Sequence, residues 1–306
     1  MIEVHDLTKR YGDKTAVDGL TFTVKPGIVT GFLGPNGSGK STTMRMILGL
    51  DRPTSGTATV NGRPYAEHAD PMFQAGALLD AKAVHTGRTA YHHLLALAAT
   101  TGIAKSRVDE VIDIVGLHEV ARKRVGGFSL GMGQRLGIAS ALLGDPEVVI
   151  LDEPTNGLDP EGVLWIRNLM RGLAEQGRTV FVSSHLMSEM ALTAEHLIVI
   201  GKGRLIADVS VSGFIESASN ESVRVRSPHA NALHDLIAGP GTTVLSLDRG
   251  LFEVSGLSAE EIGDRAAAAG IPVHELTVIR PSLEEAFMEL TKDAVEYQSA
   301  MIGASR

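Results

Sequence analysis

The sequence predicts an α/β fold with a parallel sheet, followed by a smaller α+β domain. First, a glycine-rich segment at residues 34–42 lies between a strand-like run at 28–33 and a helix-like run at 41–48. Second, apolar, β-branched runs alternate with helix-like segments from about 147 to 211, which is typical of a parallel sheet. Third, strand-like and helix-like runs follow in a new order from about 222, so a second domain begins near 216.

Composition limits the function classes. The 306 residues suffice for about two domains. The net charge of −8 comes without a basic run, which argues against nucleic acid as a partner. The chain has no cysteine, so disulfides and cysteine-ligated zinc are excluded, and a reducing cytoplasm suits it. The first residues do not resemble a signal peptide, and no apolar run approaches the ~18 residues that a membrane helix needs.

The N-terminal 65 or so residues are expected to be rich in strands, since 22–24 and 57–60 alternate apolar and polar residues. Between these strands, residues 34–42 fit G-x-x-x-x-G-K-[ST], the phosphate-binding P-loop. A glycine-rich turn with an incidental lysine is the alternative. The strand before the loop and the helix after it favour the P-loop, because that motif needs this context.

Phosphate binding explains the residue types in this loop. Glycines adopt positive φ and leave room for a ligand, so successive N–H groups can converge on an anion at the following helix N-terminus. We expect Lys40 to reach the β- and γ-phosphates and Ser41 to offer its hydroxyl to Mg²⁺. The expected nucleotide-binding residues are Gly34, Pro35, Asn36, Gly37, Ser38, Gly39, Lys40, Ser41 and Thr42.

Two carboxylates end the apolar strand-like run at 148–151. An acid at the carboxyl end of a buried strand points into the ligand crevice of an α/β sheet. Asp152 is therefore expected to hold Mg²⁺, mostly through water, and Glu153 to deprotonate the water that attacks the γ-phosphate. Strands also end in acidic turns of no catalytic role, but the upstream P-loop favours the catalytic interpretation.

The region from about 77 to 145 is predicted to be helical, because apolar residues recur at helical spacing in 91–98 and 108–117. Further strands are predicted at 179–182 and 196–200. His185 follows the first of these strands, so its imidazole can donate to a γ-phosphate. Taken alone, His185 fits a capping or surface role better, and only its position relative to the other motifs favours the site.

These ordered motifs together resemble the ATP-binding subunit of an ABC transporter, over residues 2 to about 215. The resemblance implies a P-loop NTPase fold with a RecA-like core, an antiparallel β subdomain and a helical subdomain at about 77–145. It implies that Tyr11 stacks on adenine, that His185 is the switch histidine, and that Asp159 belongs to a D-loop across a dimer seam. A plain edge-strand tyrosine is the alternative for Tyr11.

Residues 128–135 resemble the signature segment of that family, which reads LSGGQ followed by polar residues and arginine. Ser129 and Gly131 keep their places, whereas Leu130 replaces a glycine and Met132 replaces the glutamine. The resemblance implies that Ser129 and Gly131 bind the γ-phosphate of a partner subunit, helped by the helix N-terminus behind them. The lost glutamine removes one polar contact at that face.

A second departure falls in the family's glutamine loop, near residues 76–80. Asp80 occupies the glutamine's place and would bring an added negative charge to the metal site. Asp80 is either a further Mg²⁺ ligand or a solvated loop acid, and the sequence does not favour one over the other.

The second domain, at 216–306, is expected to have the βαββαβ order of a ferredoxin-like fold: strand 222–226, helix 229–238, strands 242–248 and 251–255, helix 258–269 and strand 272–279. A last helix follows Pro281, with a capping box of Ser282 and Glu285, and the residues from about 297 are expected to fray. Residues 280–287 resemble a segment of daunorubicin- and bacitracin-type exporter ATPases.

The resemblance therefore implies an ATPase subunit that powers an ABC-2-type exporter, using ATP and Mg²⁺. A homodimer shares the sites, and a separate integral-membrane permease holds the subunit at the cytoplasmic face of the cell membrane, with residues 78–88 as the coupling loop. The alternatives are an ABC-type ATPase that acts on nucleic acid or the ribosome, and a nucleotide-sensing regulator. The acidic charge argues against the first, and Lys40, Asp152, Glu153 and His185 argue against the second.

Overall fold

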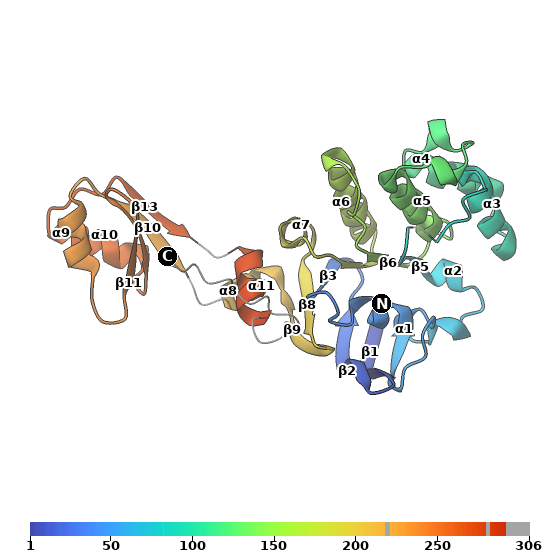
Figure 1. The fold of residues 1–306 in the computed structure, drawn as a ribbon, viewed down its shortest axis with the longest axis horizontal. Helices are drawn as coiled ribbons and strands as arrows, with labels where there is room; N and C mark the ends of the chain where they lie inside the picture. The colour runs from blue at the N-terminus through green and yellow to red at the C-terminus, as the bar shows by residue number, and fades with distance from the viewer. Residues whose placement is uncertain (82, 218–220, 280–281, 292–306) are drawn as a thin grey trace, which may run out of the picture. The chain divides into compact units, whose positions relative to one another are not determined.

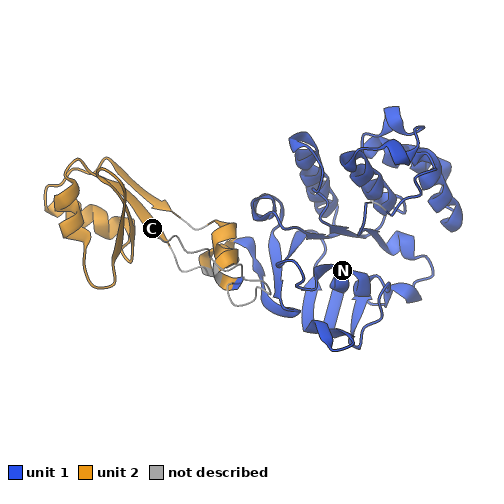
Figure 2. Ribbon diagram, in the orientation of Figure 1, with its two compact units in different colours: residues 1–211, 291–306 blue, residues 212–290 orange. Residues whose placement is uncertain are grey.

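The computed structural model describes residues 1–81, 83–217, 221–279 and 282–291 (Figure 1). They form two compact units (Figure 2). Of the described residues, unit 1 holds Met1–Val211 and Thr291, and unit 2 spans Ser212–Leu290. The division falls at the start of helix α8 (Val211–Ser217), slightly before the boundary expected at 215/216. Arg280, Pro281 and the end expected to fray lie outside the described residues.

A six-stranded sheet organises unit 1, in the order β5-β6-β7-β3-β8-β9. The strands are β3 (Val29–Leu33), β5 (Ala75–Leu78), β6 (Val148–Asp152), β7 (Thr179–Ser183), β8 (His196–Gly201) and β9 (Arg204–Ser210). Strands β5, β6, β7, β3 and β8 pair in parallel. The parallel arrangement of β3, β6, β7 and β8 was predicted, whereas β5 was not predicted as a strand. Strand β9 was not predicted. It pairs antiparallel with β8 at the sheet edge, and its residues are exposed or half-buried.

A second, antiparallel sheet joins β2 (Lys14–Val24), β1 (Ile2–Tyr11) and β4 (Ser55–Val60). It shares one core with the six-stranded sheet and with helix α1 (Lys40–Ile47). Phe22, Phe32 and Phe181 meet in that core, with ring centroids 4.9–6.0 Å apart. These aromatic contacts join β2, β3 and β7, and helix α1 buries Met44 and Ile47 in the same core.

A group of helices follows β5: α3 (Ala90–Thr101), α4 (Lys105–Ile114) and α5 (Leu130–Leu142), which lie together in Figure 1. The predicted helical region began at about 77, but Ala77 and Leu78 belong to β5, because they pair with β6 in the core sheet. The remaining helices of unit 1 are α2 (Pro71–Gln74), α6 (Pro160–Glu175) and α7 (Met187–Thr193). Of the helices described in the chain, none is long and apolar enough to cross a membrane.

Unit 2 has the predicted βαββαβ order. Its strands are β10 (Ser222–Arg226), β11 (Thr243–Asp248), β12 (Leu251–Ser255) and β13 (Glu275–Ile279), and they pair antiparallel in the order β11-β12-β10-β13. Helices α9 (Ala230–Ile237) and α10 (Ala259–Ala268) share a separate core with β10 and β12. Helix α11 (Leu283–Thr291) begins with the predicted capping box, since Ser282 and Glu285 each accept a hydrogen bond from the other's backbone N–H.

Candidate functional site

A cavity of about 620 Å³ opens at the carboxyl end of the parallel strands of unit 1. Its wall contains the predicted residues Tyr11, Asn36, Gly37, Ser38, Gly39, Lys40, Ser41, Thr42, Asp80, Asp152 and Glu153. The fold therefore collects side chains from β1, from the loop after β3, from the loop after β5 and from the end of β6. Gly34, Pro35 and His185 are absent from the wall and contact wall residues.

The loop at 34–42 has a backbone that exposes N–H groups. Gly39 is the N-cap of α1 with φ of 105°, and a Cβ there would lie 2.6 Å from the Ala16 carbonyl oxygen, so the position requires glycine. No side chain caps α1, which leaves its first-turn N–H groups for a ligand. The buried Ser38 hydroxyl likewise has no hydrogen-bond partner in the part of the chain that the structure describes. These features fit a bound phosphate chain.

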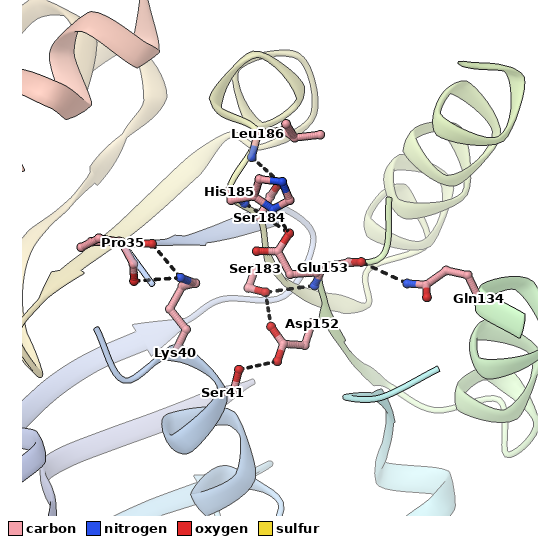
Figure 3. Close-up of polar contacts among 11 residues, drawn as sticks. Pro35, Lys40, Ser41, Gln134, Asp152, Glu153, Ser183, Ser184, His185 and Leu186 are labelled. Atoms are coloured by element: carbon pink, nitrogen blue, oxygen red, sulfur yellow. Dashed lines mark hydrogen bonds and ion pairs between the residues drawn. The ribbon is translucent and has the colours of Figure 1, made fainter. Parts of the chain in front are cut away.

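Lys40 lies 8 % exposed inside this loop, and its ammonium donates to the carbonyl oxygens of Gly34 (2.6 Å) and Pro35 (3.3 Å) (Figure 3). Burial lowers the pKa of Lys40, because the charged form loses hydration, while Glu153 and Asp152 oppose that shift. A buried ammonium beside uncapped N–H groups makes the loop an anion site.

Asp152, at the end of β6, faces Ser41 across the cavity wall. Ser41 Oγ donates to Asp152 Oδ2 at 2.6 Å, and the Ser183 hydroxyl at the end of β7 donates to Oδ1. No group of three or more His, Cys, Asp or Glu side chains that could hold a metal occurs among the described residues. Mg²⁺ commonly takes only one or two carboxylates together with phosphate and water oxygens, so this hydroxyl–carboxylate pair fits that ion.

Glu153 has φ of 51°, in the left-handed region that non-glycine residues rarely adopt. Its N–H donates to Ser183 Oγ at 3.0 Å and to the Ser183 carbonyl oxygen at 3.2 Å. Glu153 Oε2 accepts hydrogen bonds from the His185 backbone N–H (3.3 Å) and ring Nδ1 (2.6 Å). The carbonyl oxygen of Glu153 accepts from Gln134 Nε2 at 3.0 Å. The structure thus joins Asp152, Glu153 and His185 into one network (Figure 3).

Tyr11 stands at the rim of the cavity, half-exposed. Its hydroxyl donates to Asp51 Oδ2 at 3.2 Å, and Asp51 in turn accepts two hydrogen bonds from Arg45. The ammonium of Lys9 lies 4.9 Å from the ring centroid of Tyr11. The ring is therefore held in place beside the phosphate loop.

The predicted partner-facing residues Ser129, Gly131 and Asp159 do not line the cavity, although Leu130, between the first two, does. Ser129 is the N-cap of α5 and accepts from the Met132 N–H at 3.2 Å, and Asp159 is the N-cap of α6 and accepts from the Gly162 N–H at 2.8 Å. Neither of them, nor Gly131, belongs to the cavity wall of their own chain. Ser129 and Asp159 are both exposed.

Sequence reasoning missed Ser183 and seven residues of the cavity wall: Lys14, Ala16, Leu79, Ala81, Leu130, Gln134 and Asn156. Ser183 bridges Asp152 and Glu153. A hydroxyl at the end of the predicted strand 179–182 was a usable signal for Ser183, because that strand was expected beside the acidic one. Nothing in the sequence showed that the Gln134 amide reaches back to Glu153, since the two residues lie 19 positions apart.

Comparison with known proteins agrees with this geometry. Residues 17–156 match the model of the family described as ABC transporter, and residues 221–284 match a domain of unknown function, DUF8746. The chain is 45 % identical over 212 residues to the bacitracin transport ATP-binding protein BcrA of Bacillus licheniformis, covering 68 % of this chain and 69 % of that one. It is 36 % identical to the uncharacterized ABC transporter ATP-binding protein YhcH of Bacillus subtilis (strain 168), over 97 % of both chains.

A solved structure shares the fold of unit 1. The ATP-binding cassette MJ0796, in a dimeric post-hydrolysis state bound to ADP and Pi, matches with a TM-score of 0.63 and 25 % identity, over 69 % of this chain and 98 % of that one. The match to YhcH over nearly the whole chain and the fold shared with MJ0796 both agree with the predicted P-loop fold. The chain belongs to the family of ABC transporter ATP-binding proteins and is the ATP-binding and ATP-hydrolysing subunit of an ABC exporter.

Proposed function

We propose that the cavity holds Mg²⁺ and ATP, with the adenine on the Tyr11 ring and the phosphates on the loop at 34–42. One hydrogen-bonded network carries this proposal, and it runs from Ser41 through Asp152 and Ser183 to Glu153 and His185. The network joins a hydroxyl–carboxylate pair that suits Mg²⁺ to a carboxylate–imidazole pair that suits proton transfer. Lys40 shifts from its loop carbonyls to the β- and γ-phosphates when these arrive.

Glu153 orients the attacking water and accepts its proton, because Glu153 lines the same cavity as the phosphate loop. His185 donates a hydrogen bond near the γ-phosphate and holds the Glu153 carboxylate in place from the 2.6 Å contact. Bound Mg²⁺ would be held by Ser41, by Asp152 mostly through water, and by Asp80, and it supplies neutralisation of the phosphate charge.

The site is half of a shared one. Ser129, Gly131 and Asp159 lie outside the cavity of their own chain, and both Ser129 and Asp159 are exposed and available to a second copy. A homodimer therefore closes over ATP, with the α5 N-terminus of one subunit against the γ-phosphate held by the other. Hydrolysis removes that contact and reopens the dimer, which is a rigid-body switch.

The ATPase cycle drives transport through a separate integral-membrane permease. Binding to the permease keeps this subunit at the cytoplasmic face of the membrane. Residues 78–88 are the proposed coupling loop. Relatives named as bacitracin and lantibiotic transport proteins favour a peptide antibiotic, drug or lipid-like cargo.

The experiment is purification of the tagged full chain from detergent-solubilised membranes and from the soluble fraction of its host. We expect a polytopic membrane protein to co-purify stoichiometrically and to change the rate of phosphate release. Recovery with ribosomes or nucleic acid, at a yield that nuclease treatment abolishes, would contradict transport. A chain that binds ATP without releasing phosphate in either fraction would instead be a regulator.

A further inference from the structure

We propose that Gln134 is a positioning residue for ATP hydrolysis, which fixes the backbone of Glu153 and links it to helix α5 of the same chain. This inference rests on the proposed catalytic role of Glu153. It concerns a residue that touches neither the phosphate loop nor the Glu153 carboxylate in any described contact, so its effect on hydrolysis is indirect.

Gln134 is buried, with 4 % of its surface exposed, although it lies in the second turn of a helix whose first residues reach the surface. A buried amide is costly unless it makes hydrogen bonds. The Nε2 group donates to the Glu153 carbonyl oxygen at 3.0 Å, from one side of the cavity wall to the other (Figure 3). Glutamine at this position therefore has a specific partner rather than a packing role alone.

The partner is a residue whose backbone needs support. Glu153 adopts a left-handed conformation, with φ of 51°, and residues in that region persist only when their surroundings hold them there. Two elements hold Glu153 from opposite ends of its peptide groups. Ser183, at the end of β7, accepts the Glu153 N–H, and Gln134, on α5, donates to the Glu153 carbonyl oxygen. That oxygen also accepts from the backbone N–H of Asn156 at 3.2 Å, so Gln134 is its one side-chain donor among the described contacts. The direction of the Glu153 carboxylate depends on both contacts.

Helix α5 also touches the loop that follows Glu153. A Cβ added to Gly131 would lie 2.8 Å from the Gly157 carbonyl oxygen, and one added to Gly157 would lie 2.4 Å from the Leu130 side chain. One turn further on, the guanidinium of Arg135 lies 4.3 Å from the ring centroid of Trp165 on α6. On this proposal, the Gln134 contact is the route by which a shift of α5 reaches the backbone of Glu153, and α5 is the helix whose N-cap is Ser129.

The test compares Gln134→Met with the full-length wild-type chain. Methionine has a similar length and shape and forms helices well, but it cannot donate to the carbonyl oxygen. Because a small misplacement of a catalytic group costs up to about 10²-fold in rate, we expect kcat for phosphate release to fall roughly ten- to hundredfold, while KM for ATP and ATP affinity by calorimetry stay unchanged. Gln134→Glu, which turns an oxygen toward that carbonyl, should do the same.

The matched control is Ser140→Ala, on the same helix but further along it from Gln134, which removes two half-buried contacts of the Ser140 hydroxyl, to the Leu136 carbonyl oxygen and to the His93 ring. This control should keep wild-type kcat. In a Glu153→Gln background the Gln134 variants should slow phosphate release no further, because the two residues act as one unit.

The outcomes separate the two claims. Wild-type kcat in both Gln134 variants, with hydrolysis stalled in Glu153→Gln, would overturn the positioning role and leave the proposed function standing. If ATP affinity or thermal stability fell in step with kcat, Gln134 would have a structural role, and the positioning role would again be overturned. Full hydrolysis by Glu153→Gln would overturn the proposed function itself.

Discussion

At the residue scale, Asp80 separates this site most clearly from the family pattern. It lines the cavity together with Ser41 and Asp152, so its carboxylate adds negative charge where Mg²⁺ is proposed to bind. If Asp80 contributes to the metal site, Asp80→Gln should raise the Mg²⁺ concentration for half-maximal phosphate release about tenfold, because metal-site partners are commonly worth 10- to 100-fold in affinity.

The control for this prediction is Asp109→Asn, which removes the same charge from an exposed position of α4. A titration of phosphate release against Mg²⁺ gives the answer. If Asp80→Gln and Asp109→Asn both follow the wild-type curve, Asp80 is a solvated loop acid.

His93, on α3, predicts a dependence of stability on pH. Burial lowers its pKa, with a smaller contribution from the Arg88 charge, and its buried Nδ1 has no hydrogen-bond partner among the described residues. Below about pH 6.5 this histidine is therefore protonated in the unfolded chain but not in the folded chain. Because the unfolded chain then binds more protons, the free energy of unfolding decreases as pH falls toward the lowered pKa. We expect His93→Gln to lose less thermal stability than wild type between pH 7.5 and 5.5.

Thermal unfolding at several pH values checks this prediction. His92→Gln is the control, since His92 is the exposed neighbour on the same helix. A wild-type pH dependence that survives in His93→Gln would assign the effect to other groups.

The sequence predicted the residues of the site better than the contacts between them. Lys40, Asp152 and Glu153 follow from motifs, because phosphate loops and acidic strand ends have fixed local patterns. The Gln134 and Ser183 contacts to Glu153 join segments 19 and 30 residues apart, and only the packed fold brings them together. The left-handed backbone of Glu153 is likewise imposed by its surroundings, since glutamate has no preference for it.

At the scale of elements, the helices of unit 2 depend on their first turns. Ser258 is the N-cap of α10, and it forms a reciprocal capping box with Glu261. Because an N-cap serine replaced by alanine typically costs about 1 kcal/mol, Ser258→Ala should lower the free energy of unfolding of unit 2 by that amount.

Chemical denaturation, followed by the exchange of α10 amide protons, measures this loss. Ser255→Ala is the control, because Ser255 ends strand β12 and caps no helix. Equal stability of Ser258→Ala and wild type would show that the core of unit 2 holds α10 without its cap.

Element positions were predictable where periodicity was strong. The strands β3, β6, β7 and β8 carry continuous apolar runs, and β10 and β12 were predicted with the bounds that the structure has. Strand β9 was missed because an exposed edge strand carries a mixed pattern. Strand β5 was missed, and its last two residues were included in the predicted helical region, because a strand of four residues is too short to show a period. Tertiary pairing, not local preference, decides both.

At the scale of the whole molecule, the proposed working enzyme is a pair of unit 1 copies. The cavity of one chain presents the phosphate loop, Asp152 and Glu153, and the proposed counterpart is the exposed end of α5 on another chain. Unit 2 has a core of its own, and none of the described residues that line the cavity belongs to it.

The most direct test of the central claim is Glu153→Gln in the full-length chain. The amide keeps the shape of the side chain but cannot accept a proton from water. We therefore expect ATP affinity like that of wild type and phosphate release reduced at least about 10²-fold. We also expect a dimer that persists with ATP and Mg²⁺. Light scattering and a phosphate-release assay on one sample measure both effects. Near-normal turnover, or a variant that stays monomeric while it binds ATP, would contradict the account.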